Sequence, residues 1–257
     1  MELGYALSGL LVGFIVGLTG VGGGSLMTPL LVMGFGISPA TAVGTDLLYA
    51  SFTKATGVWV HARRGNVEWK LVGLLAAGSI PAALAALLCL HYLGVDSRKV
   101  GGLITGSLGV ALILTALAIL LKERLQRLSR HGAGQKWRER HVVAATITTG
   151  AVIGALVALS SVGAGALGVA ALFWLFPLFP ASRIVGSDIA HAVPLTAVAG
   201  LGHFYMGTVD WHLLVNLLIG SLPGIYLGSH LSGRIADRWL RPVLASMLVL
   251  VGGKLVL

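Results

Sequence analysis

The chain has 257 residues, of which 56% are hydrophobic and only 11% are charged, and its mean hydropathy is +0.91. A soluble domain carries about 25% charged residues, so the composition excludes a soluble globular protein, a disordered chain and a secreted disulfide scaffold. It indicates an integral membrane protein with several spans and almost no extramembrane domain. The net charge of +9 lies in short loops between apolar runs, which favours positive-inside topology over nucleic-acid binding.

In chain order, the first apolar stretch runs from Leu3 to Thr45 without a charge. It is too long for one span of about 20 residues, and Gly22-Gly23-Gly24 interrupts it, which predicts a Gly-broken or re-entrant first segment. The first twenty residues lack a basic segment and a cleavage site, so we interpret them as mature protein. The later elements expected in this half are a helix over 39–60, a polar loop over 61–70 and helices over 71–90 and 100–121.

A basic segment over residues 122–141 follows, and we interpret it as a cytoplasmic connector. It separates a first membrane repeat, residues 1–121, from a second, residues 142–257. The second repeat again begins with a long uncharged stretch, which Gly163-Ala164-Gly165 interrupts. The helices expected after it cover residues 183–204, 211–231 and 239–257.

The two halves match residue by residue. Gly13 to Gly24 corresponds to Gly154 to Gly165 at an offset of 141, and the offset becomes 142 after one inserted residue. Further matching pairs are Gly44-Thr45-Asp46 with Gly186-Ser187-Asp188, His61 with His203, Gly65 with Gly207, Val67-Glu68-Trp69 with Val209-Asp210-Trp211, and Pro81 with Pro223. An internal duplication in a membrane chain is typical of transporters. The predicted fold is therefore all-α, a polytopic membrane protein of about eight hydrophobic segments in two homologous halves.

The orientation of the halves depends on the first segment of each. If each is a re-entrant hairpin, each half has three crossings and the repeats are inverted; if each crosses completely, the repeats are parallel. With the connector in the cytoplasm and Lys54 set aside, the inverted arrangement places 14 Lys and Arg residues inside and 3 outside. The parallel arrangement places 11 inside and 6 outside. The positive-inside rule therefore favours inverted repeats.

Two short motifs suggest where a substrate binds. Helices that restart after Gly22, Gly23, Gly24 and Ser25, and after Gly163, Ala164 and Gly165, would point free N–H groups and positive dipole ends toward the membrane centre. Such ends attract anions, and glycine allows close approach to a ligand. The alternative is that these glycines only permit close helix packing.

Ionisable residues within the spans form a second group. Asp46 and Asp188 follow the hydroxyl residues Thr45 and Ser187. The carboxylates are candidates for proton or ion coupling and the hydroxyls for substrate contact, although a structural role for all four is an equal alternative.

Lys54, whose counterpart is Thr196, could attract an anion or extend to the interface. His191 lies one helical turn after Asp188 and could relay protons. His61 and His203 lie at helix ends, where an interfacial or a capping role is expected. The sequence suggests no catalytic residue, metal site or cofactor.

These motifs resemble the sulfite exporter TauE/SafE family of bacterial membrane proteins. The resemblance rests on Gly17-Leu-Thr-Gly-Val-Gly-Gly-Gly-Ser25 followed by Pro29-Leu-Leu, on Ala42-Val-Gly-Thr-Asp46, and on Gly65-Asn-Val-Glu-Trp69, together with the echo in the second half. It covers essentially the whole chain. It implies a small multi-pass transporter of the inner membrane that moves sulfite, sulfonates or related anions.

The functional prediction is a secondary transporter, not an enzyme, that exports a small sulfur-containing anion through a site where the repeats meet. Its expected partners are the anion, the lipid bilayer and a coupling ion such as a proton, and an oligomer is possible. The alternatives are an anion-selective or other small-solute channel, an intramembrane enzyme and a structural subunit of a larger complex.

Overall fold

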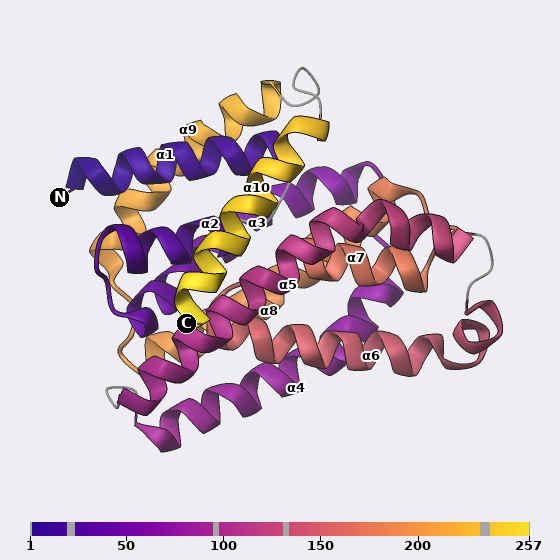
Figure 1. Ribbon diagram of the computed structural model, residues 1–257, viewed down its shortest axis with the longest axis horizontal. Helices are drawn as coiled ribbons and strands as arrows, with labels where there is room; N and C mark the ends of the chain where they lie inside the picture. The colour runs from indigo at the N-terminus through magenta and orange to yellow at the C-terminus, as the bar shows by residue number, and fades with distance from the viewer. Residues whose placement is uncertain (1, 20–23, 95–97, 131–133, 232–236, 257) are drawn as a thin grey trace.

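The computed structural model describes residues 2–19, 24–94, 98–130, 134–231 and 237–256, and within them every regular element is a helix (Figure 1). The first repeat contains α1 (Glu2–Thr19), α2 (Gly24–Pro29), the π-helical η1 (Leu30–Gly34), α3 (Pro39–Arg63), α4 (Trp69–Leu93) and α5 (Arg98–Arg130). The second contains α6 (Gln135–Ser160), α7 (Ala166–Leu175), α8 (Ala181–Tyr205), α9 (Trp211–Leu231) and α10 (Asp237–Val256). The all-α prediction is therefore confirmed.

Five stretches in the described residues are long and apolar enough to cross a membrane. They are Trp69–Leu93, Val100–Leu128, Arg140–Ser160, Ala181–Tyr205 and Trp211–Gly228. Shorter apolar helices, including Ala166–Leu175, accompany them. The total of about eight hydrophobic segments stays a prediction.

The basic connector is more helical than a polar loop would be. Helix α5 continues to Arg130 and α6 begins at Gln135, so most of the segment 122–141 extends these two helices. Charged residues one turn apart, such as Glu123 and Arg127, lie 3.9 Å from each other on the exposed surface of α5. Such a segment can stay helical outside the membrane because its long side chains have good helix propensity.

The first helix of each repeat packs against the other repeat. Helix α1 packs along α9 of the second repeat, while α6 packs along α4 of the first. Glycines allow both contacts: a Cβ atom on Gly13 would lie 2.6 Å from the Ser221 carbonyl oxygen, and one on Gly154 would lie 2.1 Å from that of Ser79. Close backbone approach at small residues is the usual packing of membrane helices, so these glycines, which lie outside the two interruptions, serve helix packing.

In each repeat, the beginning of the first helix contacts the end of the short apolar segment that follows it. In the first repeat, the ring of Tyr5 near the start of α1 lies 4.9 Å from the ring of Phe35 just after η1. In the second, Trp137 at the start of α6 lies 5.6 Å from Trp174 at the end of α7. In Figure 1 the N-terminal end of α1 lies at the left of the bundle, whereas α6 begins at the right. Helices α1 and α6 therefore begin at opposite ends of the bundle (Figure 1).

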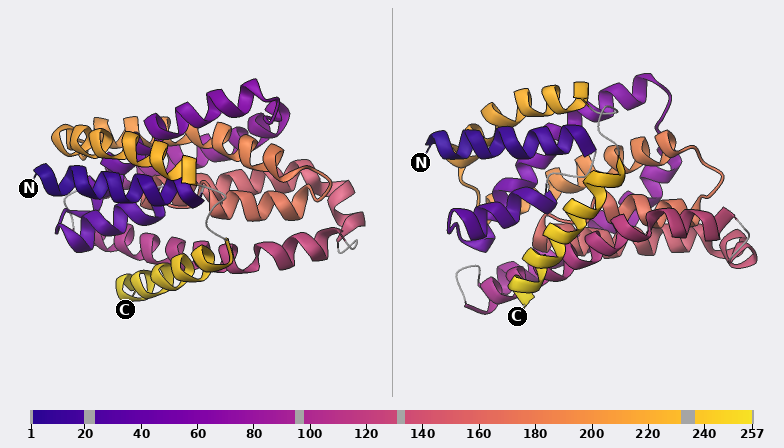
Figure 2. Two further views of the ribbon diagram at one scale, coloured as in Figure 1. Left: turned by 90° about the horizontal axis from the view of Figure 1, so that it is seen from above. Right: turned by 45° about the horizontal axis from the view of Figure 1, so that its top comes forward.

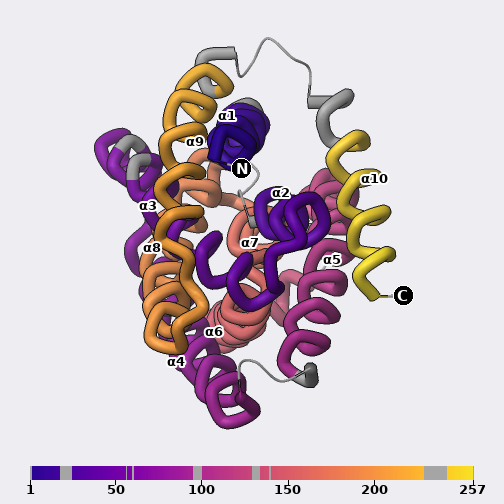
Figure 3. Tube along the Cα trace, turned by 90° about the vertical axis from the view of Figure 1, so that its left-hand side faces the viewer, coloured from indigo at the N-terminus to yellow at the C-terminus, as the bar shows by residue number. Residues whose placement is uncertain are grey.

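The short helices α2 and α7 occupy the middle of the bundle (Figure 3). Viewed end-on, α2 and α7 lie between the α3–α8 pair on one side and the α5–α10 pair on the other (Figure 3). Helix α10 packs along α5 at the outside (Figure 2). The largest hydrophobic cluster includes Leu26, Met27 and Val162, and Ala166 packs against it. The beginnings of α2 and α7 therefore share one core, which positions both near the buried charges of α3 and α8.

Candidate functional site

Two carboxylates lie at the centre of the protein, one from each repeat. Asp46 on α3 is 0% exposed and Asp188 on α8 is 1% exposed, and these two helices pack against each other. Burying a carboxylate in an apolar bundle is costly unless partners or a ligand compensate for the lost water. The surroundings of each carboxylate therefore indicate what the site can bind.

Asp46 is only partly satisfied by the protein. The Thr28 hydroxyl of α2 donates a hydrogen bond to Asp46 Oδ2 at 2.5 Å. Asp46 Oδ1 is buried without a hydrogen-bond partner. The hydroxyl of Ser161, just after α6, also lies beside this carboxylate, close enough to stabilise its charge. Two hydroxyls, one from each repeat, therefore lie beside the Asp46 carboxylate.

Asp188 lies against the first turn of α7. A Cβ atom on Gly168 would lie within 2 Å of Asp188 Oδ1, so only glycine leaves room for the carboxylate. This oxygen also lacks a hydrogen-bond partner. One turn further along α8, His191 Nε2 pairs with the Ser79 hydroxyl of α4 at 2.8 Å, while His191 Nδ1 is buried and unpaired.

Lys54 connects the two repeats. Its side chain leaves α3 half-buried, and Nζ donates a hydrogen bond of 3.0 Å to the carbonyl oxygen of Ala164, between α6 and α7. The ammonium is close enough to attract both Asp188 and Asp46. The side chain therefore turns into the bundle, unlike the alternative in which it extends to the interface.

The segment between α6 and α7 has a backbone that glycine makes possible. Gly163 and Gly165 have φ angles of 129° and 136°, which L side chains rarely adopt. The turn closes through hydrogen bonds from Gly168 N to Gly163 O and from Val169 N to Gly165 O. In the first repeat, Gly22 and Gly23 lie outside the described residues; Gly24 begins α2, and Ser25 is buried in its first turn.

Thr45 and Ser187 hold the loops of the opposite repeat. Thr45 Oγ1 accepts a hydrogen bond of 3.0 Å from the backbone N–H of Asp210, and Ser187 Oγ accepts one of 2.9 Å from that of Glu68. We call these two contacts the cross-repeat bonds. They give both hydroxyls a structural role, and their contact with substrate stays a prediction.

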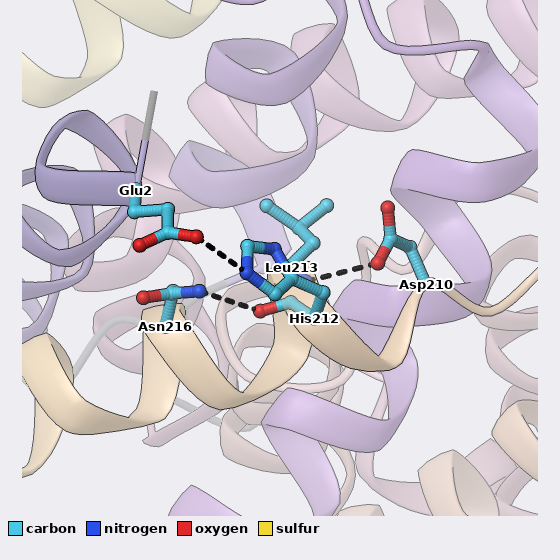
Figure 4. A network of polar contacts seen from close by, with 5 residues as sticks. All are labelled: Glu2, Asp210, His212, Leu213 and Asn216. Atoms are coloured by element: carbon cyan, nitrogen blue, oxygen red, sulfur yellow. Dashed lines mark hydrogen bonds and ion pairs between the residues drawn. The ribbon is translucent and has the colours of Figure 1, made fainter.

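Further polar contacts fix the loop that Thr45 holds (Figure 4). The Asp210 carboxylate accepts a hydrogen bond from Leu213 N at the start of α9. Two residues after Asp210, His212 Nε2 lies 3.0 Å from Glu2 Oε1 of α1. The loop between α8 and α9 is thus bound to α1 and α3 of the other repeat.

His203 has contacts of the capping kind, one of the two roles that the sequence left open, and does not lie at the interface. The residue is 0% exposed; its Nδ1 pairs with the Thr208 hydroxyl at 2.9 Å and its Nε2 with the Ala158 carbonyl at 3.0 Å. The ring is buried because it braces the loop after α8 against the end of α6. His61, at the end of α3, is half-buried.

Sequence reasoning missed three residues of the site. Thr28 and Ser79 are single hydroxyls in long apolar runs, and only tertiary contacts bring them to Asp46 and His191. Ser161 had a detectable signal, because it replaces Gly20 of the first repeat next to an interruption. Among the residues that the structure describes, no group of three His, Cys, Asp or Glu side chains could hold a metal ion.

A helical bundle with several spanning-length stretches and a buried charged cluster between two repeats has the architecture of a multi-pass membrane transporter. The chain belongs to the sulfite exporter TauE/SafE family, whose model matches residues 5–255. The predicted family and inner-membrane localisation are thereby confirmed.

Curated relatives agree with this assignment. The probable membrane transporter protein YjnA of Bacillus subtilis (strain 168) is 44% identical over 256 residues, which cover 100% of both chains. The probable membrane transporter protein YdhB of the same organism is 30% identical and covers 93% of this chain and 96% of its own. The probable membrane transporter protein MJ0441 of Methanocaldococcus jannaschii is 26% identical, with 95% and 92% covered. No solved structure matches the chain.

Proposed function

We propose that the chain is a secondary transporter that exports a small sulfur-containing anion, such as sulfite or a sulfonate, through a site between the two repeats. The observation that carries this proposal is the position of Lys54, which bonds to the Ala164 carbonyl and attracts both buried carboxylates. A cation beside the interrupted helices of an apolar bundle suits an anion, because little water competes for the charge.

In this proposal the anion lies between the two glycine segments. The N–H groups around Gly22–Ser25 and Gly163–Gly165 would face it, and the shared core of Leu26, Met27 and Val162 supports the closeness of these segments. Thr45 and Ser187 stay candidate contacts, since each directly precedes one of the carboxylates. The sequence has no nucleotide-binding motif, so gradients of substrate or ions would supply the energy.

The charges of the site suggest coupling to protons. With Asp46 and Asp188 ionised, Lys54 leaves one excess negative charge, which would repel an anion. One proton taken up with the anion restores the charge of the empty site. We therefore assign Asp46 and Asp188 as coupling groups, with His191 as a relay beside Asp188. Binding and transport should strengthen as the pH falls, because acid supplies this proton.

Inverted repeats are part of the same proposal. The contacts of Tyr5 with Phe35 and of Trp137 with Trp174 support two re-entrant hairpins, each returning to the side from which it entered. Each repeat, residues 1–121 and 142–257, would then cross the membrane three times, and the connector 122–141 would lie in the cytoplasm. Inverted repeats bring a substrate site to the middle of the membrane.

The test is flux in proteoliposomes that contain only this protein. Vesicles loaded with sulfite, thiosulfate, sulfate or methanesulfonate are compared with protein-free vesicles, with and without a pH gradient. We expect saturable, selective flux that rises as the pH falls and loses its pH response in Asp46→Asn or Asp188→Asn. Selective flux that does not saturate would indicate a channel, and no flux of any sulfur anion would refute the proposal.

A further inference from the structure

The first turns of α6 carry one buried arginine and a group of exposed side chains. Arg138 is 7% exposed, and its guanidinium carbon lies 5.7 Å from the centre of the Trp174 ring at the end of α7. This contact between a cation and an aromatic face is attractive, so it anchors the beginning of α6 to α7. The exposed side chains, which we call the α6 face, are Lys136, Trp137, Arg140 and His141. Residues three and four apart are neighbours on a helix surface, so the α6 face is continuous.

Aromatic rings place the α6 face at the surface of the membrane. The Trp137 ring lies 5.4 Å from the His141 ring, nearly parallel to it, and 5.6 Å from the Trp174 ring. Trp137 is nevertheless 48% exposed, and the candidate span Arg140–Ser160 begins just after it. Tryptophan is enriched where a span meets the lipid headgroups. The α6 face therefore lies at the depth of the headgroups.

Positive charge dominates this part of the protein. The connector over residues 122–141 contains seven Lys and Arg residues and two Glu residues. One of the two, Glu123, lies 3.9 Å from Arg127 on the exposed surface of α5. Two carboxylates offset at most two of the seven positive charges, so the connector stays strongly positive. A negatively charged group at the membrane surface complements this charge.

We propose that the α6 face binds the headgroup of an anionic phospholipid, such as phosphatidylglycerol, from the surrounding bilayer. Lys136 and Arg140, one helical turn apart, donate hydrogen bonds to the phosphate oxygens, and the Trp137 ring packs against the glycerol and the upper part of the acyl chains. A lipid fits better than free phosphate, because the exposed Trp137 needs an apolar partner beside the charges. This inference goes beyond the proposed function and does not depend on which anion is transported.

The test measures the unfolding temperature of the purified full chain in detergent with added phosphatidylglycerol, phosphatidylcholine of the same acyl chains, or inorganic phosphate. We expect phosphatidylglycerol to raise this temperature by about 5 °C more than phosphatidylcholine, because a ligand that binds only the folded state stabilises it. Lys136→Gln and Arg140→Gln should each lose about half of this difference, and the double variant nearly all of it. Both residues are exposed, so these variants should fold. The matched control Arg64→Gln removes an exposed charge from the loop after α3 and should keep the full difference.

Each outcome decides the inference without a flux measurement, so it can fail while the proposed function stands. A preference for phosphatidylglycerol that disappears in the double variant and persists in Arg64→Gln supports it. Equal stabilisation by the two lipids overturns it. An equal loss in Arg64→Gln also overturns it, because diffuse surface charge would then be the cause. If inorganic phosphate stabilises the wild type as much as phosphatidylglycerol does, the partner is a free anion, and the assignment to a lipid is wrong.

Discussion

Asp46 and Asp188 occupy equivalent positions in the two repeats, but they meet different neighbours. Asp46 accepts a hydrogen bond from Thr28 and lies beside Ser161, whereas Asp188 lies against the bare backbone of Gly168. The differences extend along the helices: Lys54 of α3 corresponds to Thr196 of α8, and Tyr49 corresponds to His191. The cation thus comes from one repeat and the buried histidine from the other.

The helix-packing and loop contacts around the carboxylates, which we call the frame, are by contrast nearly symmetric. The cross-repeat bonds of Thr45 and Ser187 are equivalent contacts with nearly equal lengths. The glycine contacts of α1 with α9 and of α6 with α4 also correspond. The two halves therefore have the same backbone contacts, whereas each half contributes different polar side chains to the site. Changes in the frame should therefore have equal effects in both repeats, and changes at the site unequal ones.

The largest effect is expected where the first helices pack. A Cβ atom on Gly220 would lie within 2 Å of the Ala6 carbonyl oxygen, and one on Gly78 within 2 Å of the Ile147 carbonyl oxygen. Gly220→Ala and Gly78→Ala should each destabilise the protein by about 3 kcal/mol, because backbone must move. The measurement is unfolding in detergent. Gly73→Ala, which meets no atom within 4 Å, is the control, and a large loss in only one of the two variants would contradict the symmetry.

The second largest effect is expected for Lys54→Thr, which replaces the central cation by the residue type found at the equivalent Thr196. It removes the positive charge that attracts two buried carboxylates. We expect a loss of about 2 kcal/mol, less than for a fully buried pair because Lys54 is half-buried, and loss of sulfite flux. The reference is Thr196→Val, which loses hydrogen bonds only to carbonyls of its own helix. Equal flux in both variants would exclude Lys54 from the site.

A smaller, symmetric effect should follow removal of a cross-repeat bond. Thr45→Val and Ser187→Ala each leave a backbone N–H without its acceptor, that of Asp210 or Glu68. Each should cost about 1 kcal/mol and speed hydrogen exchange at that amide. If sulfite binding falls while stability and exchange stay unchanged, the hydroxyl contacts substrate instead.

The smallest effect is expected for the ion pair of Glu68 and Arg183, because the equivalent residue of Glu68, Asp210, makes a different contact. Glu68 lies 3.9 Å from Arg183 at a partly exposed surface, whereas the equivalent Asp210 accepts a hydrogen bond from Leu213 N. Glu68→Gln should change stability by about 0.5 kcal/mol or less, because water and salt screen such pairs. The check is unfolding at low and high salt, and a salt-independent loss above that size would show that the pair has a larger role.

The sequence by itself determined the class of protein, the duplication and most helix positions. Hydropathy and the matching glycines are local signals, and they located α3, α4, α8 and α9 to within a few residues. The same signals singled out Asp46 and Asp188, because charges inside apolar runs are conspicuous.

Only the tertiary structure decided which groups meet these carboxylates. Thr28 bonds to Asp46 across 18 residues, Lys54 reaches Ala164 across 110, and Ser79 meets His191 across 112. Hydropathy and helical periodicity do not predict such pairs, because the pairs depend on how separate helices pack against each other. Tertiary packing also decided the place of Ser161 beside Asp46 and the loop contacts of Thr45 and Ser187, because a side chain's partner depends on how helices pack and not on its position along one helix.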